Sequence, residues 1–209
     1  MPSQTFFNLP QEKQDRIMRA AREEFFTHSM DDASINRLIK AAGIPRGSFY
    51  QYFDDKEDVY CYLGEQISRG LFAEAYQQLA ESDYDPFKLA RQVLPRWLKE
   101  VFYGENRAFF YRQIDLLYQQ QMPRVQHVQQ PLSGLSQEEL EKMAAKVNLQ
   151  DQEDLKFLLH SFLLVLVSCI SSGAADYRAG KEVDLDKLNR QLNRRLDYLE
   201  NGFRQTKRK

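Results

Sequence analysis

Apolar positions recur at helical spacing along most of the chain. In residues 11–28, Ile17, Ala21 and Phe25 stand at i, i+4 and i+8 and no Pro or Gly intervenes, which predicts an amphipathic helix. Apolar spacing and capping residues predict further helices over 35–42, 45–53, 56–82, 86–103, 105–121, 136–147, 152–179 and 184–203. The 209 residues include only nine Gly and seven Pro, too few turn residues for a β-sandwich or barrel. The fold class that follows is all-α.

Two short helices joined by a glycine-containing turn are predicted between residues 34 and 53. Ser34 is suited to cap the first helix, and Gly43 to end it in the left-handed conformation that glycine adopts at little cost. Such a pair is a helix-turn-helix. It carries no acidic side chain and three basic ones, Arg37, Lys40 and Arg46. Although the net charge of the whole chain is −1, this local patch suits phosphate binding.

The residues around the turn carry a family resemblance. AGIPRGSFYQYF at 42–53, followed by DKED at 55–58, resembles the recognition-helix signature of the TetR family of bacterial one-component regulators. The resemblance covers about residues 11–60. It implies a three-helix DNA-binding domain at 1–55 and a helical effector-binding and dimerisation domain at 56–209. It also implies a cytoplasmic repressor that binds a palindromic operator in double-stranded DNA as a homodimer and is released by a small molecule.

The resemblance, carried over residue by residue, assigns DNA contacts to the helix-turn-helix. Arg46 opens the recognition helix, Gly47 lets the DNA backbone approach, and Gln51 can pair with an adenine edge. Pro45 and Tyr52 depart from the Ser and His that are frequent in the family, so the polar contacts at these two places should differ. With Arg37 from the basic patch, the expected DNA-binding set is Ser34, Arg37, Arg46, Gly47, Ser48, Tyr50, Gln51, Tyr52 and Lys56.

Some side chains of the helix-turn-helix can be explained by the fold alone, without a contact to DNA. Phe49 and Phe53 are expected in the core shared by the helices. Arg37 and Lys40 fit a solvated helix face as well as they fit a phosphate contact.

The two C-terminal helices carry apolar seams at three-four spacing. One seam runs from Leu155 to Gly173 and the other from Leu185 to Phe203. Two such helices cannot bury this surface on each other, so a four-helix bundle with a second copy is expected. The alternative is burial against the preceding helices of the same chain. The expected dimer interface comprises Ser161, Val165, Leu166, Ser168, Ser172, Leu188, Leu192 and Leu199.

One apolar segment is barely long enough to cross a bilayer. Residues 157–175 contain no charged side chain, but serines and His160 dilute the segment and no anchoring residues flank it. A buried helix and no membrane partner are therefore expected. The N-terminus lacks the basic and apolar regions of a signal peptide. Cys61 and Cys169 lie far apart and form no metal or redox motif, which favours a reduced, cytoplasmic protein without a bound metal.

An apolar effector pocket is also implied by the resemblance. Aromatic side chains with a few polar tips suit such a site, although an aromatic stripe of this kind is also ordinary core. The candidate lining is Trp97, Phe110, Tyr111, Ile114, Tyr118 and His160. No feature of the sequence names the effector.

Enzymatic functions find little support in the sequence. GxGxxG, phosphate-binding-loop and HExxH motifs are absent, and no cofactor is expected. One alternative is a helical enzyme or ligand carrier whose helix-turn-helix is only structural. Another is a helical interaction protein that docks through its last helix and its basic tail, Arg204, Lys207, Arg208 and Lys209.

Overall fold

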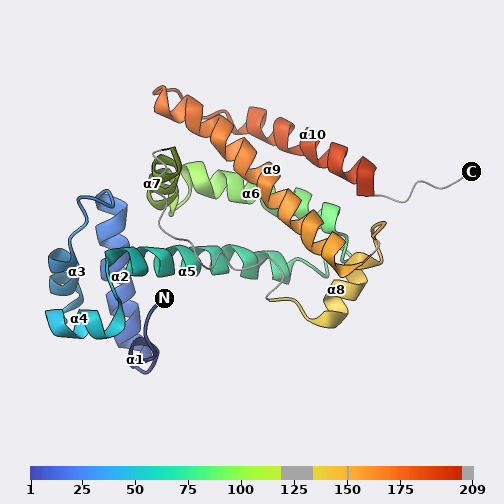
Figure 1. Cartoon of the computed structure of the whole chain (residues 1–209). Helices are drawn as coiled ribbons and strands as arrows, with labels where there is room; N and C mark the ends of the chain where they lie inside the picture. The colour runs from blue at the N-terminus through green and yellow to red at the C-terminus, as the bar shows by residue number, and fades with distance from the viewer. Residues whose placement is uncertain (119–133, 150, 204–209) are drawn as a thin grey trace, which may run out of the picture. The chain divides into compact units, whose positions relative to one another are not determined.

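The computed structural model describes residues 1–118, 134–149 and 151–203. Every regular element in these ranges is an α-helix (Figure 1), as the sequence predicts. The helices are α1 (Gln4–Phe7), α2 (Gln11–Thr27), α3 (Ile35–Ala42), α4 (Arg46–Tyr52), α5 (Lys56–Gln77), α6 (Pro86–Tyr103), α7 (Arg107–Tyr118), α8 (Gln137–Ala144), α9 (Gln152–Arg178) and α10 (Leu185–Phe203).

The chain forms two compact units whose boundary differs from the expected one. Among the described residues, unit 1 comprises 1–68 and 108–118, and unit 2 comprises 69–107, 134–149 and 151–203. The sequence places the boundary after residue 55. In the structure, unit 1 also takes in the first half of α5 and α7, because Phe109 and Leu116 of α7 are buried in the same core as Val59 and Tyr60 of α5.

Capping residues fix the helix-turn-helix of unit 1. The Ser34 hydroxyl accepts a hydrogen bond from the Arg37 N–H and begins α3, as the sequence predicts. Gly43 ends α3 at φ 63°, in the left-handed region. Leu38 of α3 and Phe49 of α4 are buried with Ile17 of α2 in one apolar cluster. Each such side chain stabilises the fold by about 2 kcal/mol through its removal from water.

The short helix α1 is absent from the sequence prediction. Ser3 caps it, and the ring of Phe6 is fully buried in the core of unit 1. Phe6 packs on Phe53 and Tyr62, with ring centroids 5.0 and 5.6 Å away. A helix of four residues is too short to show an apolar period, so the pattern gave no signal for it.

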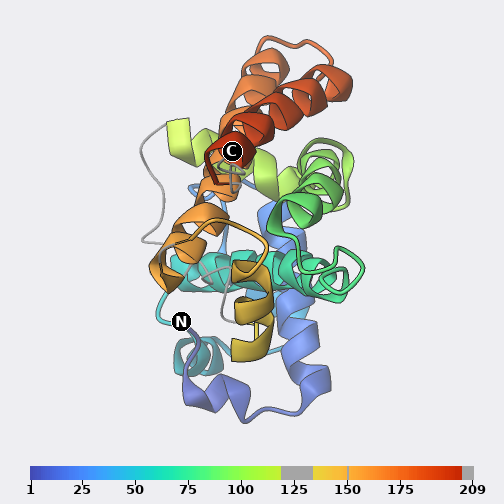
Figure 2. The same ribbon diagram turned by 90° about the vertical axis from the view of Figure 1, so that its right-hand side faces the viewer.

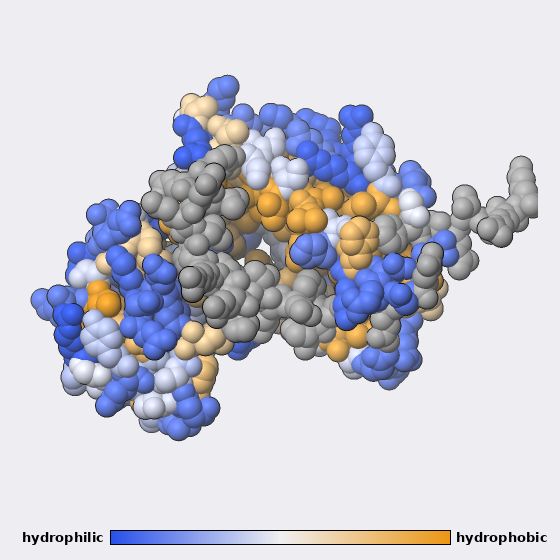
Figure 3. All heavy atoms as spheres, in the orientation of Figure 1, coloured by the Kyte–Doolittle hydropathy of each residue, from blue (hydrophilic) through white to orange (hydrophobic). Residues whose placement is uncertain are grey.

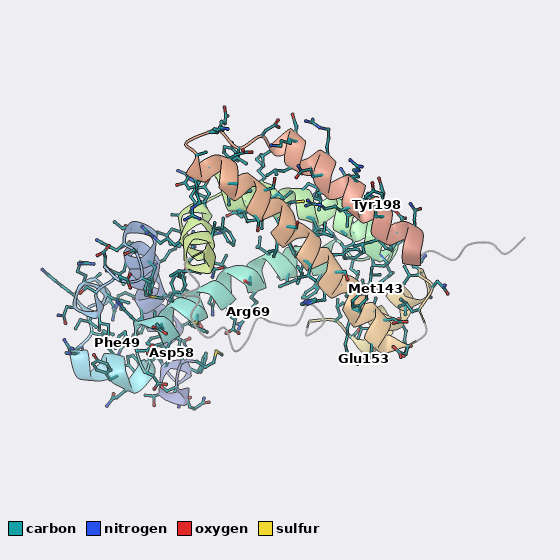
Figure 4. All side chains as sticks on the ribbon, turned by 45° about the horizontal axis from the view of Figure 1, so that its top comes forward. Phe49, Asp58, Arg69, Met143, Glu153 and Tyr198 are labelled. Carbon is teal, nitrogen blue, oxygen red and sulfur yellow. The ribbon has the colours of Figure 1, made fainter. Side chains whose placement is uncertain are left out.

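Unit 2 is built around three long helices. α10 packs on both α6 and α9, and α6 packs on α9. Figures 1 and 2 show α9 and α10 side by side and antiparallel. A separate apolar cluster joins Leu79, Met143 of α8 and Leu155 of α9, and Figure 4 labels Met143. α8 begins with the predicted capping box, in which Ser136 and Glu139 bond each other's backbone N–H.

Candidate functional site

One side of α4 faces solvent while the other side holds the helix in the core. Phe49 and Tyr52 are buried, whereas Arg46, Gly47, Tyr50 and Gln51 are exposed. Gly47, Tyr50 and Gln51 stand at i, i+3 and i+4 and therefore share one face of the helix. We call Arg46, Gly47, Tyr50 and Gln51 the outer face of α4. Figure 4 labels Phe49, whose fully buried ring anchors the inner side.

Arg46 is held in place at the junction of α3 and α4. Its guanidinium donates to the side-chain oxygen of Asn36 at 2.8 Å and to the Tyr50 hydroxyl at 3.3 Å. The guanidinium carbon also lies 5.7 Å from the centroid of the Tyr50 ring, within reach of a cation–π interaction. The pair presents a positive charge and a phenol hydroxyl in an ordered arrangement, and Tyr50 remains 48% exposed.

Gly47 is not required by the packing of this chain. A Cβ built at this position would meet no atom within 4 Å. The residue lies in the first turn of α4, where a missing side chain leaves backbone N–H groups open to a ligand. The small size of this residue therefore suits an approach from outside the chain.

Arg37, one of the expected DNA contacts, has a structural partner within the chain. Its Nε and Nη2 atoms donate to the buried carboxylate of Glu24 on α2, at 3.1 and 2.6 Å. The Ser34 N–H donates to the same carboxylate at 2.7 Å. Burial tends to raise the pKa of Glu24, but the bonds from Arg37 and Ser34 outweigh burial and lower it below its ordinary value. Arg37 thus ties the start of α3 to α2.

Two further expected DNA contacts are also occupied within unit 1. The Tyr52 ring is 4% exposed, and its hydroxyl accepts from Lys13 Nζ at 3.2 Å, so Tyr52 belongs to the core. Lys56 is half-buried and donates to the carbonyls of Asp31 and Ala33 at 3.2 and 3.4 Å. Ser48 is also half-buried. The sequence could not show these partners because they come from other helices and loops.

Unit 2 contains a cavity between the end of α5, α6, α8 and α9. The empty space inside it, measured out to its mouth, is about 520 Å3. Trp97 lines it, as expected, together with Phe72, Leu94, Met143 and Phe162.

The other residues of the expected lining lie elsewhere. Phe110, Tyr111 and Ile114 belong to α7 in unit 1, where Phe110 packs on the core and Ile114 is buried. His160 is exposed on α9. The side chain of Tyr118 lies outside the described residues. Aromatic composition identified α7 as apolar but gave no means to tell core from pocket.

The surface that α9 and α10 leave uncovered differs from the expected dimer seam. Leu166, Leu188 and Leu192 are buried within unit 2, because α6 covers this side of both helices. These three residues are therefore corrected from interface to core. Ser161 is also buried, and its hydroxyl donates to the Phe157 carbonyl at 2.7 Å.

An apolar stripe faces outward instead, and Figure 3 shows apolar residues gathered over α9. Val165, Ser172 and Leu199 are half-buried and Ser168 is exposed beside it. We call this stripe the outer surface of α9 and α10; its large exposed members are Phe157, Leu164, Val167 and Tyr198. By length and composition alone, residues 153–178 would also suffice to cross a membrane.

Comparison with known proteins gives a consistent identification. The family described as bacterial regulatory proteins, tetR family, matches residues 17–62, which contain α3, α4 and most of α2. The HTH-type transcriptional regulator AcrR of Shigella flexneri is 27% identical over 97 residues, 46% of this chain and 45% of that protein. The chain therefore spans about half the length of this curated relative.

Solved structures extend the likeness over the whole chain. A TetR family transcriptional regulator from Chloroflexus aurantiacus has 28% identity and a TM-score of 0.50, over 99% of this chain and 100% of that chain. The multidrug binding protein EbrR, complexed with ethidium, shares the fold at 18% identity and a TM-score of 0.57, over 90% and 99% of the two chains. The helix-turn-helix of this chain therefore matches that of the tetR family of bacterial regulatory proteins, and the chain as a whole resembles a solved regulator of that family.

Proposed function

We propose that this protein is a transcriptional regulator that binds operator DNA through the outer face of α4. The observation that carries the proposal is the exposed Arg46–Tyr50 pair, which is ordered by Asn36 yet serves no buried contact. A guanidinium and a phenol hydroxyl beside an exposed helix N-terminus suit phosphate oxygens. Gln51, on the same face, has the amide that pairs with adenine in the major groove.

The cavity of unit 2 is the proposed effector site. Apolar walls with a few polar groups are typical of small-molecule sites. A ligand that binds one shape of the regulator more tightly than another shifts the equilibrium between them by that difference in affinity. On this proposal the protein is a repressor, and its effector favours the shape that releases DNA.

A second copy of this chain is the proposed partner of the outer surface of α9 and α10. Exposed apolar side chains from two neighbouring helices form a patch of the kind that protein interfaces bury. A two-fold pair would present two copies of α4 to the two half-sites of a palindromic operator. With operator DNA as its partner, the protein would act in the bacterial cytoplasm rather than through a membrane-spanning α9.

Gel shifts on an operator selected from random DNA test the first proposal. Arg46→Ala should weaken binding and reduce the slope of log affinity against log salt by about one unit, because one phosphate contact is lost. Arg190→Ala removes the same charge from an exposed position on α10 and should change neither. If both substitutions weakened binding equally, Arg46 would act only through the net charge of the protein. Unchanged binding in Arg46→Ala would refute the assignment of the outer face of α4 as the DNA-binding surface.

A further inference from the structure

The cavity of unit 2 has an unusually uniform lining. Every lining residue among those described is apolar or aromatic, and none is Asp, Glu, Lys, Arg or His. A charged group that entered this space would lose its hydration without gaining a partner of opposite charge. The lining therefore selects against ions of either sign.

One polar group of the lining has no hydrogen-bond partner. The indole nitrogen of Trp97 is buried, and none of the described residues accepts from it. The other polar group, the Tyr76 hydroxyl, is hydrogen-bonded by the backbone of Gly134. Since buried polar groups are normally satisfied, the Trp97 N–H calls for an acceptor that the described chain does not supply.

The shape of the cavity limits what can enter. Only a small part of its empty space lies clear of the surrounding side chains, so a wide ligand would have to displace them. The Trp97 ring is itself fixed, edge-on to Phe72 with ring centroids 5.2 Å apart. A slender chain fits such a space better than a broad polycyclic ring system.

We propose that the cavity takes an uncharged, slender aliphatic molecule whose oxygen accepts the Trp97 N–H. A ketone, an ester or an ether has the required chemistry, since each offers an acceptor without a charge. The inference rests on the proposed effector role of the cavity and names the ligand class for it. It sets this chain apart from a receptor for cationic dyes.

A matched series of eight-carbon ligands tests the class. Trp97 is the only tryptophan of the chain, so its fluorescence reports directly on the cavity. Titration with 2-octanone should give a saturable change in emission at neutral pH. Octanoate and octylammonium, with comparable chains and a charged head, should bind at least about a hundredfold more weakly. Equal binding of all three, or no binding of 2-octanone, would overturn the proposal.

Calorimetry on two variants tests the hydrogen bond. Trp97→Phe keeps a ring against Phe72 but removes the indole N–H donor, and should weaken the binding of 2-octanone about fivefold. Phe110→Leu alters an aromatic residue outside the cavity and should leave the affinity unchanged. An unchanged affinity in Trp97→Phe would overturn the assigned acceptor contact.

Gel shifts on the same samples separate this inference from the proposed function. If 2-octanone fails to bind while operator binding is intact, the ligand class is wrong and the regulator remains. If 2-octanone binds with the expected selectivity but leaves operator affinity unchanged, the ligand class holds and the effector role of the cavity is refuted.

Discussion

Glu24 is a buried carboxylate whose position is set by the residues that donate to it. Its side chain is 6% exposed and accepts from Arg37 and from the Ser34 N–H, and His28 Nδ1 lies 3.5 Å from one of its oxygens. Removing a carboxylate from water is costly, and only good geometry with several donors offsets that cost. The arrangement fixes the loop between α2 and α3, and therefore the place of the whole helix-turn-helix.

Glu24→Gln should destabilise the protein by about 2 kcal/mol at neutral pH, because it removes charged hydrogen bonds to Arg37. The pKa of Glu24 is lowered in the folded protein from its ordinary 4.5. Its contribution is therefore complete above about pH 4.5 and is lost as the pH falls through the folded-state pKa. Urea unfolding of both proteins from pH 7 to pH 3 should show the difference shrinking on acidification.

Glu23→Gln provides the matched control for this measurement. Glu23 precedes Glu24 on α2 but is exposed, so its substitution should change stability by less than about 0.5 kcal/mol. A loss in Glu24→Gln that stayed constant down to pH 3 would contradict a role for the ionised carboxylate.

At the scale of elements, α1 completes the end of α4. The last carbonyls of a helix have no partner within it. Ser3 supplies two hydrogen-bond donors for these carbonyls. Its N–H donates to the Tyr52 carbonyl at 2.8 Å, and its hydroxyl donates to the Gln51 carbonyl at 2.5 Å. Phe6 then holds this segment in the core beside Phe53. The helix that carries Tyr50 and Gln51 is thus fixed by a segment that precedes the helix-turn-helix.

Phe6→Ala should cost about 3–5 kcal/mol, since it empties a fully buried site. It should also weaken operator binding in conditions where the protein remains folded, because the end of α4 loses its support. Hydrogen exchange should be faster in the variant than in the wild type, and this increase should be larger for the amides of α4 than for those of α2.

Phe7→Ala tests the same segment without emptying the core. Phe7 is 42% exposed, so this variant should cost no more than about 1 kcal/mol and leave exchange in α4 unchanged. Equal protection of α4 in all three proteins would show that α1 contributes to stability alone.

The sequence predicts elements that are defined by their own residues. Ser34, Gly43 and the Ser136–Glu139 box mark helix ends through contacts within a few positions, and the observed bounds of α3 agree with the prediction. The intrachain contacts of Arg37 and Tyr52 could not be predicted because their partners, Glu24 and Lys13, lie on another helix. Spacing along one helix does not report such contacts.

Helix α9 shows a different limit of sequence reasoning. This helix is apolar on two sides. The spacing of its apolar residues therefore shows that the helix is packed against other elements, but not which side packs within its own chain. The structure places Leu166 inside and Leu164 outside. Only the arrangement of α6, α9 and α10 decides between the two sides, and that arrangement depends on the whole of unit 2.

For the molecule as a whole, the outer surface of α9 and α10 predicts a dimer. Leu164 is 56% exposed, so Leu164→Glu should fold normally but separate the two chains, because a buried interface would have to take in an unpaired charge. Sedimentation at micromolar concentration should give a dimer for the wild type and a monomer for Leu164→Glu. Ala145→Glu, at an exposed position after α8, should remain dimeric.

Leu166→Glu distinguishes the observed surface from the seam that periodicity suggested. Leu166 is buried within unit 2, so a glutamate there should unfold the protein rather than release a stable monomer. A folded, monomeric Leu166→Glu protein would contradict the assignment of Leu166 to the core.

Operator geometry provides the last prediction, because a dimer can use both copies of α4 only if the DNA presents two half-sites correctly. Recognition helices of a two-fold dimer meet successive major grooves about 34 Å apart. A short α4 with one arginine, one tyrosine and one glutamine on its outer face makes few contacts, so a single half-site should bind weakly.

The operator should be an inverted repeat, and five base pairs added at its centre should turn one half-site to the opposite side of the duplex. Footprinting should then show protection of the original operator and none of the expanded one at the same protein concentration, with the Leu164→Glu monomer failing on both. Equal protection of the two operators would refute binding by a symmetric dimer while leaving the contacts of α4 intact.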